Sequence, residues 1–237
     1  MHRSAPRLTR ILACAAVPVM LVVAGCSSDS DSKSKDSATA SPTPEAKKSP
    51  TVAPATFGKL PEPCDSIGEK TIEDLVPSAK SKSGTEGKSS DISRRGSCSW
   101  NGLDDNGVKG SQYRWLDVSF LRYESDATLA VSAEQRAEES YDKEIAKAQA
   151  SEGAKDVKTS PAAGIGDEAT TVTYKLRKTG EDFTYATVVA RTENGVVTLT
   201  YNGTGYAGAK NPSTSDITKG AVKAAKEAVA SVATANK

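Results

Sequence analysis

Histidine is nearly absent from this chain of 237 residues, since the one histidine is His2. Without histidine elsewhere, neither a Ser-His-Asp triad nor a Cys-His pair is available to activate a nucleophile. Zinc, copper and iron sites built on histidine are excluded on the same ground. The remaining chemistries use carboxylate, Ser-Lys or Tyr groups. We expect no catalytic residue, no metal site and no cofactor.

Long apolar runs and an excess of one charge are also missing. The chain has 31 Lys and Arg against 30 Asp and Glu, a formal charge of +1, and its aromatic content is only 5%. A nucleic-acid-binding protein would carry a clear basic excess, so we expect no nucleic-acid partner. No run reaches 18 apolar residues, so no segment is predicted to span a membrane as a helix.

Residues 1–25 have the pattern of a bacterial lipoprotein signal peptide. They carry no acidic residue, and their positive charge comes from Arg3, Arg7 and Arg10. The apolar stretch 11–25 is too short to span a bilayer and has the usual length of a secretory h-region. It ends in Val23-Ala24-Gly25-Cys26, the order of a lipobox, which predicts a diacylglyceryl group on Cys26. The alternative is an ordinary secreted precursor with a spare thiol.

The predicted anchor places the mature chain at the cell membrane, on its extracytoplasmic face. Two acyl chains are enough for stable anchoring, whereas one chain gives only marginal binding. Residues 26–60 that follow are rich in Ser, Thr, Asp, Lys, Ala and Pro, with Val52 and Phe57 as the large apolar residues of the segment up to Leu60. Such a composition does not bury enough surface to offset the entropy of ordering, so we predict a disordered tether.

Residues 61–237 have the length of a single domain. Apolar spacing of three and four residues predicts three helices. The first is capped by Asp65 or Ser66 and stops before Pro77, the second covers 126–152, and the last is capped by Ser215 or Asp216. The segment 80–91 is predicted to be a polar loop.

Alternating apolar residues predict strands between these helices. The predicted strands cover 97–101, 112–123, 170–178, 183–191 and 196–201. The Asn194-Gly195 pair predicts a hairpin with Leu199 opposite Ala190 and Tyr201 opposite Val188. Strands joined by hairpins, with helices before, between and after them, favour an α+β fold in which an antiparallel sheet packs against helices.

Cysteine use is sparse, and only two of the four cysteines remain after the signal peptide and the lipid site are set aside. Cys64 and Cys98 form an even pair in an exported, oxidising setting, which favours a disulfide. Two free buried thiols are the alternative. A metal site is less favoured, because two sulfurs without histidine make a poor ligand set.

The aromatic residues suggest one candidate binding surface. Its members are Trp100, Tyr113, Trp115 and Tyr123. One explanation of these four aromatic residues is that they pack in the core under a helix. The other is that they form a binding platform for a lipid, glycan or peptide ligand.

Several segments together resemble a known family. They are Pro63-Cys64-Asp65, Ser97-Cys98-Ser99-Trp100, Tyr113 to Val118, Gly164 to Ala169, and Asn194 to Val197. With the lipobox and the polar tether, they are similar to actinobacterial secreted lipoproteins built on a domain of unknown function. The resemblance covers residues 61–205, although Ile165 stands where that family would have Leu. It implies a curved antiparallel sheet with helices, like the sensor domains of actinobacterial kinases, and a Cys64–Cys98 bridge beside Trp100. It implies no substrate.

Three functional hypotheses follow from the sequence. The first is a non-enzymatic binding or sensing module, with a small apolar ligand or an envelope protein as partner. The second is a structural or accessory subunit of a cell-envelope complex. The third is a hydrolase that uses two carboxylates about 5–9 Å apart, for which Asp117, Asp167 and Glu168 are the candidates.

Overall fold

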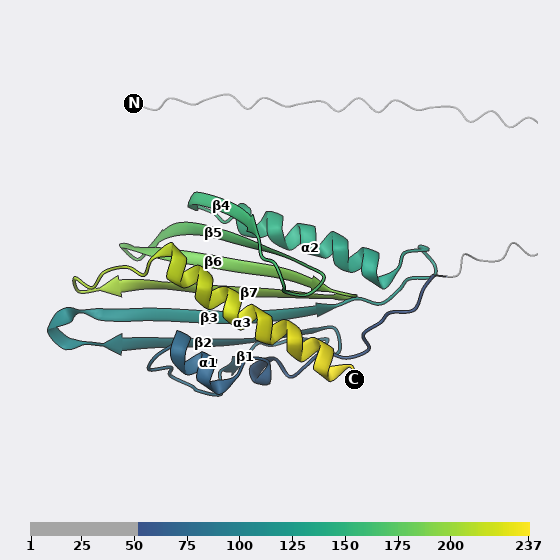
Figure 1. Cartoon of the computed structure of the whole chain (residues 1–237), viewed down its shortest axis with the longest axis horizontal. Helices are drawn as coiled ribbons and strands as arrows, with labels where there is room; N and C mark the ends of the chain where they lie inside the picture. The colour runs from purple at the N-terminus through teal and green to yellow at the C-terminus, as the bar shows by residue number, and fades with distance from the viewer. Residues whose placement is uncertain (1–51) are drawn as a thin grey trace, which may run out of the picture. The chain divides into compact units, whose positions relative to one another are not determined.

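The computed structural model describes residues 52–237, so the predictions for residues 1–25, for Cys26 and for the tether up to residue 51 lie outside it. Within this range the chain forms seven strands, three α-helices and two short 3₁₀ helices (Figure 1). In chain order these are η1 (Pro63–Asp65), α1 (Glu69–Leu75), β1 (Thr85–Glu86), β2 (Arg95–Asp105), η2 (Gly107–Lys109), β3 (Ser111–Arg122), α2 (Ala133–Gln149), β4 (Lys155–Pro161), β5 (Glu168–Lys178), β6 (Glu181–Thr192), β7 (Gly195–Tyr206) and α3 (Thr214–Ala235).

The strands form one antiparallel sheet in the order β1-β2-β3-β7-β6-β5-β4. Helix α3 crosses the middle of one face, and α1 lies beside it over the β2 end of the sheet (Figure 1). Helix α2 packs against β4 to β7 on the opposite face. This architecture confirms the predicted α+β class, because a single antiparallel sheet is covered by helices on its two faces.

Alternation along β3 explains why both faces are covered. Leu116, Val118 and Phe120 are fully buried in the main core with α1 and α3. The intervening residues, among them Tyr113 and Asp117, point to the α2 face because successive strand side chains alternate. The predicted strand 112–123 is therefore confirmed in position and in its two-sided character.

Small residues let α3 approach the sheet closely. Its buried side includes four alanines with almost no exposed surface: Ala221, Ala224, Ala225 and Ala228. A Cβ on Gly220 would lie 2.8 Å from both the Tyr201 ring and the Leu75 side chain. The Tyr201 hydroxyl donates a hydrogen bond to the Leu75 carbonyl at 2.6 Å. Glycine is needed at this point because α1, α3 and β7 meet there.

The β6–β7 hairpin exists where it was predicted, but its register differs by two residues. Leu199 pairs with Val188 rather than with Ala190. The two loop residues are Glu193 and Asn194, and Glu193 adopts a left-handed conformation with φ 49°. The turn lies one residue earlier than predicted because the Asn194 side chain is buried and hydrogen bonded inside the domain.

Helix α2 begins later than the predicted residue 126. The Asp126 carboxylate accepts hydrogen bonds from the backbone N–H groups of Thr128 and Leu129, which makes a turn instead of a helix start. Ser132 then caps the helix, since its hydroxyl accepts from Gln135 N–H at 3.1 Å. Side-chain competition for backbone donors explains the difference.

The other helix caps were also predicted a few residues away from their positions. Helix α1 is preceded by Gly68 rather than by Asp65 or Ser66, and α3 is capped by Ser213 rather than by Ser215 or Asp216. The Ser213 hydroxyl accepts from Asp216 N–H at 3.1 Å. Boundaries of this kind depend on which nearby hydroxyl reaches the first free backbone donors.

Three segments differ from the expected loops and tether. The exposed edge strand β4 was not predicted, because it lacks an apolar face. The polar segment 80–91 contains β1, which pairs with β2. Residues 53–60, expected in the tether, are hydrogen bonded to the domain, and Phe57 and Leu60 pack against the core.

Candidate functional site

The four candidate aromatic residues do not form one surface. Trp100 pairs with Leu116 across β2 and β3, and both side chains lie on the α3 face. Trp100 is only 2% exposed. Tyr113, Trp115 and Tyr123 lie toward the α2 face, and there Tyr113 and Tyr123 belong to separate apolar clusters. Trp115 is 42% exposed. The structure therefore leaves Trp115 as the indole that a ligand can reach without unfolding the core.

Trp100 is part of a structural corner that includes the disulfide. Cys64 and Cys98 are bonded, which confirms the predicted bridge. The Trp100 indole N–H donates to the Lys82 carbonyl at 3.1 Å, and Gly84 is packed against both Trp100 and the Cys98 sulfur. These contacts attach the 80–84 segment to β2, so the role of Trp100 is packing.

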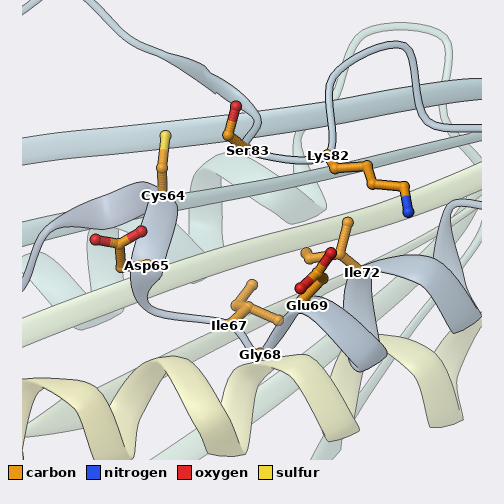
Figure 2. A pocket seen from close by; sticks show the side chains of 8 residues that line it. All are labelled: Cys64, Asp65, Ile67, Gly68, Glu69, Ile72, Lys82 and Ser83. Atoms are coloured by element: carbon orange, nitrogen blue, oxygen red, sulfur yellow. The ribbon is translucent and has the colours of Figure 1, made fainter.

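A hollow of about 430 Å³ opens beside this corner, next to the start of α1. Figure 2 shows Ile67, Glu69 and Ile72 facing Lys82 and Ser83 across it. Lys82 is already paired with Glu73 at 2.8 Å. The hollow thus combines two apolar side chains with Lys82, which is paired with Glu73, and with the exposed carboxylates of Asp65 and Glu69.

A second hollow, of about 200 Å³, lies between α2 and the sheet. Its lining combines ionisable groups with hydroxyl groups, from Asp117, Ser119, Glu144, Lys147, Ala148, Ser151, Tyr174, Thr187, Thr198 and Thr200. We call this the Asp117 groove. The strand register explains its composition, because Ser99, Asp117, Thr200 and Thr187 stand in one row across β2, β3, β7 and β6. Their side chains share the face on which α2 lies.

Asp117 is the unusual residue of this groove. No hydrogen bond from residues 52–237 reaches its carboxylate, and burial raises its pKa from 3.8 to about 6. The positive charge of Lys147 opposes this rise in pKa. Lys147 forms its ion pair with Glu144, at 3.3 Å, rather than with Asp117. A carboxylate that is desolvated without a partner costs stability, and such groups in clefts are typical of functional sites.

Neighbouring polar groups differ in whether they have partners. The hydroxyls of Thr187 and Thr200 hydrogen bond to each other at 3.1 Å. Asn202, which is only 3% exposed, has a buried Oδ1 with no hydrogen-bond donor among residues 52–237. Asn202 pairs with Trp115 in the sheet, one row of side chains away from Asp117. This part of the sheet face therefore holds acceptors that lack donors.

The three carboxylates proposed for a hydrolase are not brought together. Asp167 and Glu168 both form ion pairs with Arg191. The row of paired residues that contains Asp117 reaches β5, three strands away, at Val172. Glu168 lies four residues before Val172 on that strand. Strand spacings of about 4.8 Å and a rise of about 3.3 Å per residue put Glu168 and Asp117 roughly 20 Å apart. That separation exceeds the distance at which two carboxylates act on one bond.

Two further observations concern residues 52–237 as a whole. No group of three or more His, Cys, Asp and Glu side chains in this range is placed to hold a metal ion. None of the helices in the same range combines the length and the apolarity needed to cross a bilayer.

No protein-family model matches the chain, and no curated protein matches it. Among solved structures, the chain is similar to the crystal structure of LpqN, which is involved in cell envelope biogenesis of Mycobacterium tuberculosis. The similarity has 16% identity and a TM-score of 0.28, over 53% of this chain and 66% of LpqN. The chain thus spans just under two thirds of LpqN, and the match establishes neither a family nor an activity.

Proposed function

We propose that this chain is a non-enzymatic binding or sensing module that acts outside the cytoplasm and is held at the cell membrane through a lipid on Cys26. The anchor rests on the lipobox Val23-Ala24-Gly25-Cys26 and on the signal peptide before it. The domain that this anchor carries is braced by the Cys64–Cys98 disulfide, as suits an oxidising compartment. Its ligand binds in the Asp117 groove.

The observation that carries the binding function is the unpartnered, desolvated carboxylate of Asp117. A perturbed carboxylate in a cleft is typical of a functional site, because a neutral or apolar residue at the same position would stabilise the fold. The hydroxyls around it supply further hydrogen-bonding groups at fixed positions on a sheet and a helix. In the hollow beside α1, the carboxylates of Asp65 and Glu69 are not held on the sheet among hydroxyl groups as Asp117 is.

The experiment is native mass spectrometry of the full chain purified from the membranes of its own host. We expect a bound species that dissociates on collisional activation. It should be lost from the Asp117→Asn variant and kept by Asp142→Asn, a matched change on the exposed side of α2. An unliganded wild-type chain, or a species bound equally by both variants, would contradict a ligand site in the groove. A bound species that is chemically cleaved on incubation with wild type would instead support the hydrolase hypothesis.

A further inference from the structure

We infer that the ligand of the Asp117 groove is a neutral carbohydrate that stacks on Trp115 and donates hydroxyl hydrogen bonds to Asp117. This inference rests on the proposed function and names the chemical class of its ligand. It depends on the part of the sheet face that α2 leaves open, on the unpartnered Asp117 carboxylate there, and on the charge of Lys147.

The open part of the sheet lies beside the groove. Helix α2 packs mainly over β4 to β7, so it leaves the same face of β2 and the adjoining side chains around Trp115 largely uncovered. Its side chains are partly or largely exposed, and they include Ser99, Asn101, Leu103, Trp115 and Asp117. A ligand that enters the groove at Asp117 therefore extends onto this open face.

Trp115 and Asp117 are successive residues on this face of β3. Side chains two residues apart on a strand are separated by about 7 Å, which is the width of a sugar ring and its substituents. The exposed Trp115 ring provides an apolar surface, while Asp117 provides two acceptor oxygens. One monosaccharide can thus cover the indole with its C–H face and direct hydroxyl groups to the carboxylate.

The hydrogen-bonding balance favours a ligand that donates. The Asp117 carboxylate and the buried Asn202 Oδ1 both lack donors within residues 52–237. A carboxylate without donors is costly to bury, and a donor-rich ligand in the groove would remove that cost at Asp117. The Asn202 Oδ1 has no exposed surface, so a ligand does not reach it in this conformation. The Thr187 and Thr200 hydroxyls, already bonded to each other, can rotate to donate or accept as a sugar hydroxyl requires.

Lys147 disfavours a cationic ligand. It is near enough to Asp117 to lower the pKa of that carboxyl, and it lines the same groove. A protonated amine at Asp117 would therefore be repelled by the Lys147 ammonium, although Glu144 offsets part of this charge. A neutral polyhydroxylated ligand meets no such repulsion. A purely apolar ligand would leave Asp117 desolvated and unpaired.

The test is binding of defined sugars to the full chain in a zwitterionic detergent that carries no sugar headgroup. The probes are neutral di- to tetrasaccharides of glucose, galactose, mannose and arabinose, with spermidine as the cationic comparison. We expect at least one saccharide to bind with a Kd below roughly 5 mM by calorimetry. Binding should weaken at least tenfold in Trp115→Ala and in Asp117→Asn, and should be unchanged in Asp142→Asn.

Trp115→Phe provides a conservative second variant. It keeps an aromatic face, so it should retain binding by calorimetry while losing the fluorescence change on titration, because Trp100 is the other tryptophan and is buried. Saccharide affinity that is unchanged in both Trp115→Ala and Asp117→Asn would overturn the inference. Binding of spermidine without binding of any saccharide would also overturn it. If no saccharide binds and the species isolated from the host still depends on Asp117, the carbohydrate inference fails while the proposed function stands.

Discussion

Asn194 and Phe57 exchange two hydrogen bonds, although 137 residues separate them in the chain. The Phe57 N–H donates to Asn194 Oδ1 at 2.7 Å, and Asn194 Nδ2 donates to the Phe57 carbonyl at 2.9 Å. The same amide nitrogen donates to the Tyr123 carbonyl at 2.7 Å. A fully buried side chain in the β6–β7 turn thus holds both the end of β3 and the segment through which the chain enters the domain.

Asn194→Ala should lower the free energy of unfolding by about 2–4 kcal/mol, because three backbone groups lose their partner. Urea unfolding measures this loss. Limited proteolysis should cut the 53–60 segment faster in the variant. Asn236→Ala is the control, since Asn236 also binds this segment, through Gly58 and Lys59, but at an exposed position. An equal effect of the two substitutions would contradict the role assigned to Asn194.

Asp117→Asn should stabilise the protein in a pH-dependent manner. The pKa of Asp117 is about 6 in the folded chain, above its ordinary value of 3.8, so folding favours the protonated form. The wild type therefore loses stability as pH rises from about 4 to about 6, and Asn lacks this loss. We expect the variant to be more stable by about 1–2 kcal/mol at pH 7.5, after allowance for the partial exposure of the side chain. Below pH 4 the two proteins should unfold alike, and a variant less stable than wild type at pH 7.5 would refute the desolvation argument.

Loss of the disulfide should destabilise the domain strongly. The bridge joins cysteines separated by 34 positions. The chain-entropy estimate for a loop of this length is about 3.8 kcal/mol. Denaturant unfolding of Cys64→Ala/Cys98→Ala, and of wild type with and without dithiothreitol, measures the effect. Dithiothreitol should leave the double variant unchanged, and an equally large effect on it would point to another cause.

Truncation of the two tryptophans should destabilise the domain to very different extents. Trp100→Ala should cost about 3–5 kcal/mol because it removes a buried ring. Trp115→Ala should cost less, about 1–2 kcal/mol, because the ring is 42% exposed and has less buried area to lose. Each Trp→Phe variant keeps one tryptophan, so its fluorescence reports on that residue alone. Acrylamide should quench the exposed Trp115 of Trp100→Phe much more than the buried Trp100 of Trp115→Phe. Equal quenching would show that Trp115 is covered in solution.

Cys26→Ala should release the protein from the membrane or leave its precursor unprocessed. The expected cause is the loss of the thioether that carries two acyl chains. Fractionation with labelled palmitate distinguishes lipid anchoring from simple secretion. Cys14→Ala, a change within the signal peptide, is the matched control and should still incorporate label. Unchanged membrane retention and labelling of Cys26→Ala would remove the basis for the anchor.

The β6–β7 hairpin shows why the sequence predicts a turn but not the exact pairing of the two strands. Asn194-Gly195 indicates a turn from local conformational preference alone. The turn instead centres on Glu193 and Asn194, because the Asn194 side chain is used by Phe57 and Tyr123. The hydrogen bonds that Asn194 makes with these distant segments outweigh the local turn preference. Register also decides that Trp100 and Trp115 lie on opposite faces of the sheet, since Trp100 pairs with Leu116 while Trp115 pairs with Asn101.

The amino-acid sequence by itself determined the fold class, the two-sided strand β3, the existence of the hairpin and the pairing of Cys64 with Cys98, because alternation, turn chemistry and an even number of exported cysteines are local or countable properties. Only the tertiary structure decided that Asp117 is partly desolvated without gaining a hydrogen-bond partner. That outcome depends on α2, which packs over β4 to β7 beside Asp117 and leaves the adjoining face of β2 and β3 open. Desolvation is a property of neighbours in space, and no spacing along the chain encodes it.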